Sequence, residues 1–194
     1  MGKLFPGQVS IKKRYGKVIL VSGQLSDKLS AANPEIAIAF LSRYQHFFGI
    51  NNPQKNLRTT ACATDQLGMT HITFQQVYHG IPVDYNQLKV HFSADNVITS
   101  VHGNYLNDLG DASIGTQPSL SKESAIVVAR LALQDPSAEC HGVELVIFPY
   151  QDRFYLAYRF ILRGDHPHSK AWQIYVDADT GTILDKYPAG PTAG

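Results

Sequence analysis

The chain has 194 residues, of which 44% are hydrophobic and 17% charged, and its formal net charge is +1. This length suits one or two domains, and the apolar fraction is large enough for well-packed cores. The small net charge gives no sign of a nucleic acid or an anionic surface as partner. No stretch approaches the eighteen apolar residues of a membrane span, and the apolar run at 18–21 is too short for the core of a secretory signal.

The first forty-nine residues predict one strand and one helix. A basic, irregular opening segment precedes a short apolar strand at 18–21. Asn33 is a suitable N-cap, Pro34 suits the first helical position, and Glu35 lies near the positive end of the helix dipole. Gly49 is placed where a C-cap glycine ends a helix. The helical stripe between them is interpreted as packing on a sheet rather than binding a partner; it comprises Ile36, Phe40, Leu41, Tyr44, Phe47 and Phe48.

The next segment predicts an antiparallel meander of three strands. Residues 51–63 are polar and rich in turn formers, which favours an irregular excursion before it. Strands are predicted at 69–78, at 88–92 and at 97–102, because each is rich in β-formers or alternates with period two. Turns at 79–82 and at Asp95-Asn96 separate them. We expect Phe74 and Leu88 to share a core with Phe40 and Tyr44.

The second half repeats the order of helix and then sheet. Residues 110–118 are small and flexible, so we predict two modules, 1–110 and 111–194. Ser121 caps a second helix that ends before Pro136. Strands are predicted at 144–148, 155–162 and 172–177, followed by a turn at 177–181 and a short strand at 182–184. The fold class is therefore α+β, with each half a helix packed on an antiparallel sheet.

The chain lacks the usual motifs of catalysis. The sequence contains no H-E-x-x-H, no G-x-S-x-G, no phosphate-binding glycine loop and no C-x-x-C. His71, His91 and His102 lie in the meander, where neighbouring strands could bring two of them together. A metal site normally needs three or four ligands, so we interpret them as ordinary half-exposed histidines. His166 and His168 lie in a loop and could bind metal adventitiously. We predict no catalytic residue, no metal ligand and no enzymatic activity.

The two cysteines, Cys62 and Cys140, are too few for a disulfide scaffold. Their separation allows a bridge between the two modules. Two free, buried thiols are the interpretation that we favour.

The meander also carries a family resemblance. The runs LGMTHITFQQVYHGIPV, QLKVHF and VITSVHGN resemble the propeptide of thermolysin-like and fungalysin zinc proteases. The chain departs from the usual pattern at 84–86, where a glycine is common. The second half, ending in WQIYVDADTGTIL, resembles the PepSY module that follows in such prosegments. The positions that carry the two resemblances are Leu67-Gly68, His71, Gln75-Gln76, Tyr78, Gly80, Pro82-Val83, Leu88, Val90-His91, Val101, Gly103-Asn104, Trp172, Val176-Asp177-Ala178 and Thr180-Gly181.

This resemblance implies two cystatin-like modules and the role of a prosegment. Such a chain acts as intramolecular chaperone and inhibitor of a secreted thermolysin-like zinc metalloprotease, by occluding its active-site cleft. The partner is the protease catalytic domain, which holds the zinc, so no cofactor is expected here. We expect no nucleic acid or membrane as partner and a secreted or periplasmic location. The alternatives are a free-standing extracellular or periplasmic binding protein built from the same modules and, less favoured, a small enzyme.

The resemblance and the local chemistry together predict a set of protease-binding residues and a set of structural residues. One of Gln75 and Gln76 must face the core, where its amide either pins the turn at 80–82 or, as the other possibility, contacts the protease. The tail from residue 187 to 194 is poor in helix formers, so it could enter a cleft or form a loose linker. The predicted protease-binding residues are Gln76, Tyr187, Pro188, Ala189, Gly190 and Gly194. The predicted structural residues are Gln75, Tyr78, Gly80, Pro82, Gly103, Trp172, Asp177 and Gly181.

Overall fold

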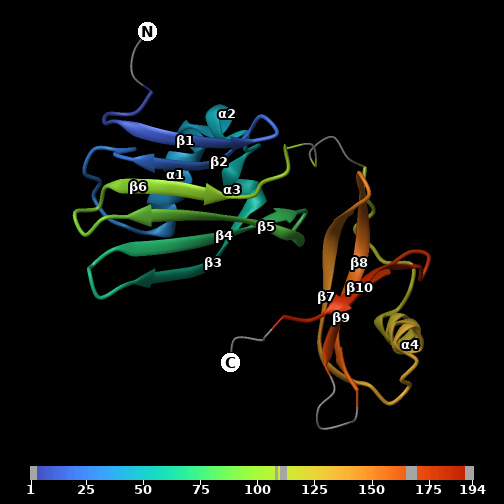
Figure 1. Cartoon of the computed structure of the whole chain (residues 1–194). Coiled ribbons are helices and arrows are strands. Elements are labelled where there is room, and N and C mark those ends of the chain that lie inside the picture. Colours follow the sequence, from blue (N-terminus) through green and yellow to red (C-terminus); the bar gives the residue numbers. More distant parts are fainter. Residues whose placement is uncertain (1–3, 108, 110–112, 165–169, 191–194) are drawn as a thin grey trace. The chain divides into compact units, whose positions relative to one another are not determined.

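The computed structural model describes residues 4–107, 109, 113–164 and 170–190, and it is mostly β-sheet with few helices (Figure 1). The chain divides into two compact units. Unit 1 comprises Met1–Gly80 and Tyr85–Asp111, and unit 2 comprises Ile81–Asp84 and Ala112–Gly194. The short segment Ile81–Asp84 therefore belongs to the second unit although it lies within the first half of the chain.

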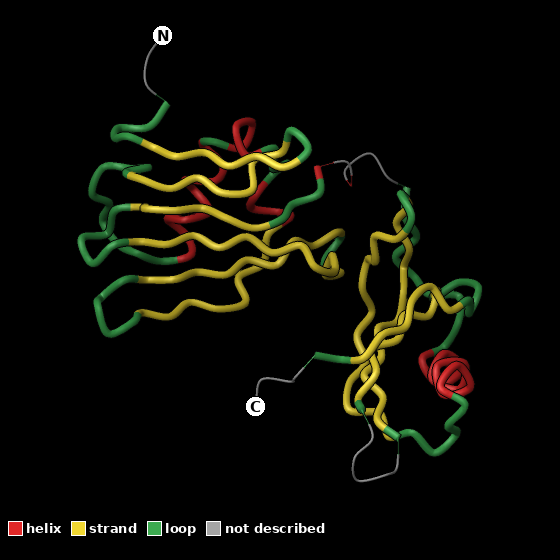
Figure 2. Tube along the Cα trace, in the orientation of Figure 1, coloured by secondary structure: helices red, strands yellow, loops and turns green. Residues whose placement is uncertain are grey.

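Unit 1 contains an antiparallel sheet whose described strands run in the order β1-β2-β6-β5-β4-β3 (Figure 2). The predicted meander is confirmed as β4 (Thr70–Tyr78), β5 (Ile81–Phe92) and β6 (Ile98–Gly103). The predicted strand near residue 18 is β2 (Lys17–Gly23). The two outer strands are β1 (Val9–Arg14) and β3 (Leu57–Thr64).

The outer strands correct two predictions, since their segments were expected to be irregular. Nearly every side chain of β1 and β3 is exposed. An edge strand that buries neither face carries no alternation of apolar and polar residues, so the pattern that reveals a strand is absent. Cys62 lies on β3 and is exposed, which contradicts the expectation of a buried thiol there. Both cysteines are free.

The turn between β4 and β5 is tighter than predicted. Only His79 and Gly80 form it, with φ values of 48° and 86°. Two successive residues at positive φ suit the two-residue turn of a β-hairpin, because the turn's twist then matches that of the strands. The second strand of the meander consequently begins at Ile81 rather than at Leu88, and Pro82 lies within it.

Three helices of unit 1 lie on one side of its sheet: α1 (Pro34–Arg43), α2 (Gln45–Phe48) and α3 (Pro53–Asn56) (Figure 1). The predicted N-cap is confirmed, because Oδ1 of Asn33 accepts a hydrogen bond from the Ile36 N–H at 2.9 Å. Gly49, at φ 65°, ends α2 as predicted. The single predicted helix is interrupted at Tyr44, whose backbone leaves the helical region at φ −108°.

The core of unit 1 contains the residues that the helical stripe and the meander predicted. Phe40, Phe74 and Leu88 are buried in one cluster, and Tyr44 packs against it partly buried. Phe5 joins this core from the N-terminal segment, with its ring 5.0 Å from that of Tyr44. The predicted packing of the aromatic stripe on the sheet is therefore confirmed.

Unit 2 contains α4 (Lys122–Leu133) and the antiparallel strands β7 (Glu139–Tyr150), β8 (Arg153–Arg163), β9 (Ala171–Asp177) and β10 (Ile183–Pro188), in that order. The Ser121 hydroxyl caps α4 by accepting the Ser124 N–H at 3.1 Å, as predicted. The helix buries Ala125 and Ala129. Val83 lies at the start of β5, in the segment that belongs to unit 2, and it pairs in parallel with Ile147 of β7.

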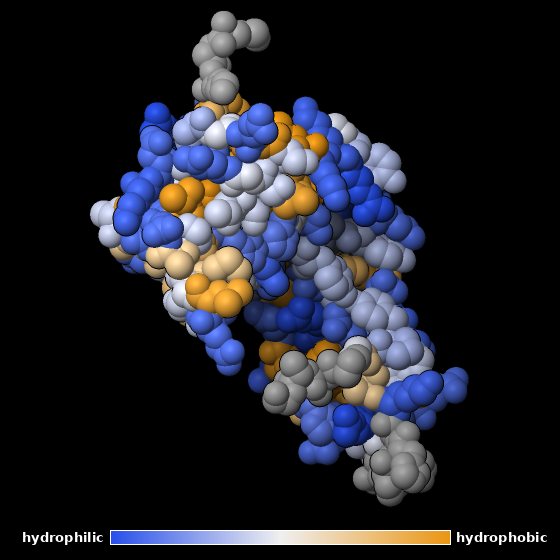
Figure 3. Space-filling model, turned by 60° about the vertical axis from the view of Figure 1, so that its left-hand side comes forward, coloured by the Kyte–Doolittle hydropathy of each residue, from blue (hydrophilic) through white to orange (hydrophobic). Residues whose placement is uncertain are grey.

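The visible face in Figure 3 is largely hydrophilic, with hydrophobic side chains in small separate patches. Among the described residues, no helix is both long enough and apolar enough to cross a membrane.

Candidate functional site

Gln76 and Gln75 lie on opposite sides of β4 and have different partners. Gln76 is 2% exposed. Its Nε2 donates to the Leu106 carbonyl at 2.8 Å, and its Oε1 accepts the Leu106 N–H at 2.9 Å. Gln75 lies on the other face, where its Nε2 donates to the Asn86 carbonyl at 3.0 Å. The buried amide therefore holds the segment after β6, and the expectation that it pins the turn at 80–82 is wrong.

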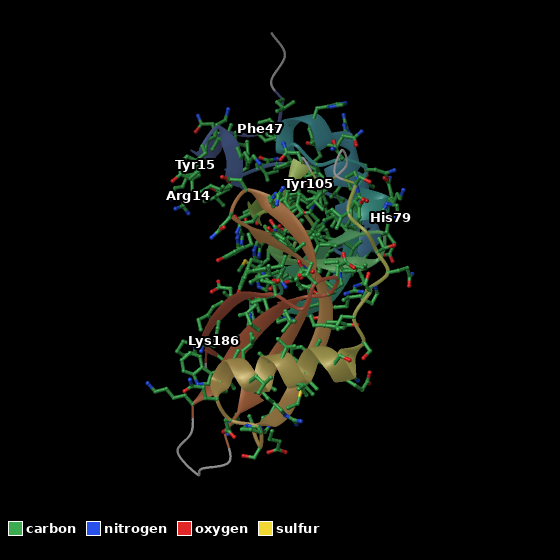
Figure 4. All side chains as sticks on the ribbon, turned by 90° about the vertical axis from the view of Figure 1, so that its right-hand side faces the viewer. Arg14, Tyr15, Phe47, His79, Tyr105 and Lys186 are labelled. Atoms are coloured by element: carbon green, nitrogen blue, oxygen red, sulfur yellow. The ribbon has the colours of Figure 1, made fainter. Side chains whose placement is uncertain are left out.

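Gln76 also lines a pocket of unit 1 between α3, the end of β4 and the residues Tyr105, Leu106 and Leu109. Its rim includes His79 and Tyr105 (Figure 4). The Tyr105 hydroxyl donates to the Asn51 carbonyl at 3.0 Å, and burial raises the pKa of this phenol. Polar side chains such as Gln76 and Tyr105 thus share this pocket with apolar ones. Contact of Gln76 with a protease stays a prediction.

The predicted tail begins inside the sheet rather than after it. Tyr187 and Pro188 belong to β10, where they pair with Gln173 and Trp172 of β9, and the Ala189 N–H donates to the Ala171 carbonyl at 2.7 Å. The strand therefore extends four residues beyond the predicted end at residue 184. A proline is tolerated at this position because β10 is an edge strand of the described sheet and lacks a further partner.

The Tyr187 side chain explains why the strand continues. It packs against the buried cluster of Val146, Phe148, Ala157, Tyr175 and Leu184. Its hydroxyl accepts from Gln173 Nε2 at 2.8 Å and lies 3.0 Å from the Tyr175 hydroxyl. Apolar burial and hydrogen bonding together hold the first part of the tail on unit 2. Gly190 is the last residue of the described tail, and Gly194 lies outside the described residues.

The predicted structural residues occupy turns and strand contacts. A Cβ on Gly103, whose φ is +135°, would lie 2.0 Å from the Gln87 carbonyl oxygen, so only glycine fits there. Gly181, at φ +75°, ends the turn in which Asp177 Oδ1 accepts two backbone N–H groups. The Trp172 ring lies under the Lys186 ammonium, which is 5.6 Å from the ring centroid. Tyr78 ends β4 beside His79, and its ring meets the imidazole edge-on.

A charged network in unit 2 was not predicted. Asp84, which is 5% exposed, accepts from Arg159 Nη1 at 2.6 Å and from the Tyr175 hydroxyl. Arg159 Nη2 also donates to Glu144 at 2.5 Å. Burial lowers the pKa of the guanidinium, but the two carboxylates outweigh burial and raise it. The bonded residues lie 75 and 91 positions from Asp84 in the chain, so no local pattern signals the contact.

The structure brings all three histidines of the meander together, where the sequence suggested that two of them could meet. They form a row with Asp65, which lies in the turn between β3 and β4. Within the described ranges, no group of three or more His, Cys, Asp or Glu side chains is arranged to hold a metal ion. His166 and His168 lie outside those ranges.

Comparison with known proteins finds a family motif in the meander. Residues 55–105, which include β4 to β6, match the Fungalysin/Thermolysin Propeptide Motif. This segment therefore carries the propeptide motif of fungalysin and thermolysin. Bacillolysin from Bacillus subtilis (strain 168) is 30% identical over 81% of this chain and 32% of its own length. Thermolysin from Alicyclobacillus acidocaldarius subsp. acidocaldarius is 29% identical over 86% of this chain and 32% of its own length.

This chain spans about a third of the length of the curated relatives it matches. The matches cover the propeptide region of these precursors. Among solved structures, the C-terminal domain of YpeB from Bacillus megaterium aligns with 94% of this chain and 76% of its own. That alignment has 18% identity and a TM-score of 0.45.

Proposed function

We propose that this chain is the prosegment of a secreted thermolysin-like zinc metalloprotease, assisting the folding of the catalytic domain and occluding its active-site cleft. The observation that carries the proposal is the match to the propeptide region of the bacillolysin and thermolysin precursors. The zinc of the complex belongs to the catalytic domain. The prosegment then contributes a complementary surface and a length of chain, and needs no reactive residue of its own.

The proposal includes two cystatin-like modules, the second of the PepSY type. Its support in unit 1 is the single cluster in which Phe40 and Leu41 of α1 pack with Ile72 and Phe74 of β4. Its support in unit 2 is α4, which buries Ala125 and Ala129 beside four antiparallel strands. Each module thus has its own core, as an independently folding template requires.

The proposed route of inhibition follows from the edge position of β10. An edge strand offers unpaired N–H and carbonyl groups to a strand of another protein. Among the described strands, β10 pairs only with β9, and the predicted cleft-binding tail continues directly from it. Because Tyr187 anchors this strand on unit 2, the residues after it are tethered, and tethering raises their effective concentration near a cleft.

The test is inhibition of bacillolysin from Bacillus subtilis by the full chain and by a chain that lacks residues 190–194. The deletion leaves β10 and Tyr187 intact, so we expect the same melting temperature. Inhibition should weaken by at least tenfold, which corresponds to about 1.4 kcal/mol. Tyr15→Ala, a change at a side chain that is 92% exposed, is the control and should inhibit like the full chain.

The outcomes separate the parts of the proposal. Equal inhibition constants for the full and the shortened chain would remove the tail from the mechanism and leave the module surfaces. Failure of the full chain both to inhibit the protease and to raise the yield of its refolded catalytic domain would contradict the proposal. A gene that ends directly after Gly194, without a following H-E-x-x-H frame, would favour the free-standing binding protein instead.

A further inference from the structure

The histidine row of unit 1 is a continuous chain of hydrogen bonds across three adjacent strands. His71 lies on β4, His91 on β5 and His102 on β6. His71 Nδ1 lies 2.5 Å from His91 Nδ1, and His91 Nε2 lies 2.9 Å from His102 Nε2. At the other end, His71 Nε2 lies 3.0 Å from Asp65 Oδ2. We call these four side chains the histidine chain.

The rings meet through their nitrogens rather than their faces. The His91 and His102 rings are parallel to within 4°, but their nitrogens are 2.9 Å apart, closer than the roughly 3.5 Å of stacked rings. The His71 and His91 centroids are 4.8 Å apart, so their two nitrogens lie between the rings. His91 uses opposite nitrogens for its two neighbours. The three rings therefore do not converge on one point, which excludes a shared metal ion in this arrangement.

Each contact of the histidine chain needs one proton. A neutral imidazole has one N–H donor and one bare nitrogen acceptor. If His71 donates to Asp65, then His91 must donate to His71, and His102 must donate to His91. Three neutral rings thus supply the three protons that the three contacts require, and Nδ1 of His102 stays bare.

The number of contacts limits how many additional protons the histidine chain can accept. A first additional proton can bind at the bare Nδ1 of His102 without disturbing any contact. A second would place two N–H groups against each other within one short nitrogen–nitrogen contact, which breaks that contact. We infer that the histidine chain is an acid-sensitive switch, which holds β4, β5 and β6 together when neutral and loosens unit 1 when it takes up more than one proton.

The surroundings of the chain reinforce this behaviour. Lys89 on β5 pairs directly with His102, so it adds a positive charge on the same face of the sheet. The neighbours from the other strands are uncharged: Ser100 pairs with His91, Ala63 with His71, and Leu20 with His102. Asp65, the acidic member of the histidine chain, contacts His71 among the three rings, at the end opposite His102. Its other oxygen, Oδ1, accepts the backbone N–H groups of Leu67 and Met69.

The pKa values of two of the rings are lowered, which is the direction that an acid-sensitive switch requires. Burial, then the charges of His102, His71 and Lys89, lower the pKa of His91 to about 4. Burial and Lys89 lower that of His102. An unfolded chain binds these protons near pH 6.5, the ordinary value, so it holds more protons than the folded chain between about pH 6.5 and 4. Stability is therefore complete above this window and falls as the pH decreases through it. The lowered pKa of Asp65, caused mainly by His71, adds a loss only at still lower pH.

The experiment compares thermal melting of the full chain at pH 7.5 and pH 5.0, followed by far-ultraviolet circular dichroism. The single tryptophan, Trp172, lies in unit 2, so its fluorescence follows that unit separately. We expect the transition of unit 1 at pH 5.0 to be lower by at least about 5 °C. His91→Asn should lower the melting temperature at pH 7.5 but shrink the difference between the two pH values by at least half. His79→Asn changes a histidine that is not part of the histidine chain, so it should leave that difference unchanged.

A second measurement applies even if His91→Asn does not fold. Nitrogen-15 NMR of the imidazoles in the unsubstituted chain reports the tautomer and titration of each ring. We expect His91 to be protonated at Nδ1 and to titrate below pH 5. Titration of His91 near pH 6.5, or an unchanged difference between the two pH values in a folded His91→Asn variant, would overturn the inference. Neither result depends on the proposed inhibitory function.

Discussion

The buried Asp84 carboxylate permits a sharp test of the packing in unit 2. Replacing Arg159 with methionine keeps much of the side-chain volume but removes the guanidinium 2.6 Å from Asp84. Asp84 is 5% exposed, and removing one partner of a buried pair leaves an uncompensated charge, which costs about 3–5 kcal/mol. The other ion pair of Arg159 involves Glu144, whose side chain is 43% exposed, and an exposed pair contributes only about 0.2–1 kcal/mol.

The two substitutions Arg159→Met and Glu144→Gln therefore form a matched pair with very different expected costs. The assay is urea unfolding of the full chain, followed by the fluorescence of Trp172, which lies in the same unit. A third variant, Asp84→Asn combined with Arg159→Met, removes both charges and should recover part of the loss, because no isolated buried charge remains. The reasoning would be refuted if Arg159→Met and Glu144→Gln differed by less than about 1 kcal/mol.

Three further substitutions test unit 1, each measured by urea unfolding followed by circular dichroism. Phe74→Ala should cost about 3–5 kcal/mol, because this fully buried ring is central to the core. Gly103→Ala should cost more than the roughly 1–3 kcal/mol of a strained backbone, since the new Cβ would also lie 2.0 Å from the Gln87 carbonyl oxygen. Gln76→Leu should cost about 1–3 kcal/mol by leaving the N–H and carbonyl of Leu106 without their amide partner.

Each of these variants has a control on the same unit. Leu67→Ala removes a side chain that is 76% exposed and should change stability by less than about 0.5 kcal/mol. Gly16 has φ +77°, and no atom lies within 4 Å of the Cβ that alanine would add. Gly16→Ala therefore measures the cost of the left-handed backbone conformation alone, which is roughly 1–2 kcal/mol. A core variant that unfolds at the same denaturant concentration as its control would show that the assigned contact is unimportant.

The local elements with strong patterns were predictable from the sequence. Asn33 and Ser121 were recognised as caps because a short polar side chain before an apolar helical stripe has one preferred use. The meander was recognised because one face of its strands is buried, which imposes alternation on the residues. The family resemblance rested on the same segment, and the matched motif covers it.

The remaining features depend on contacts between distant residues. The edge strands β1 and β3 bury neither face, so their sequences carry no pattern. Tyr187 extends β10 because its side chain packs on a buried cluster that includes residues of β7, β8 and β9. That cluster exists only after folding.

The charged network and the histidine chain show most clearly which features the sequence predicts and which the tertiary structure decides. The sequence by itself placed three histidines on neighbouring strands of one meander. Only the register between those strands decided that the ring nitrogens pair one after another across the sheet. This pairing leaves no free site for a second additional proton. The sequence likewise offered no reason to pair Asp84 with Arg159, since nothing local distinguishes this arginine from a solvated one. Side-chain alternation is a local property of the backbone, whereas register and burial are set by the packing of the whole unit.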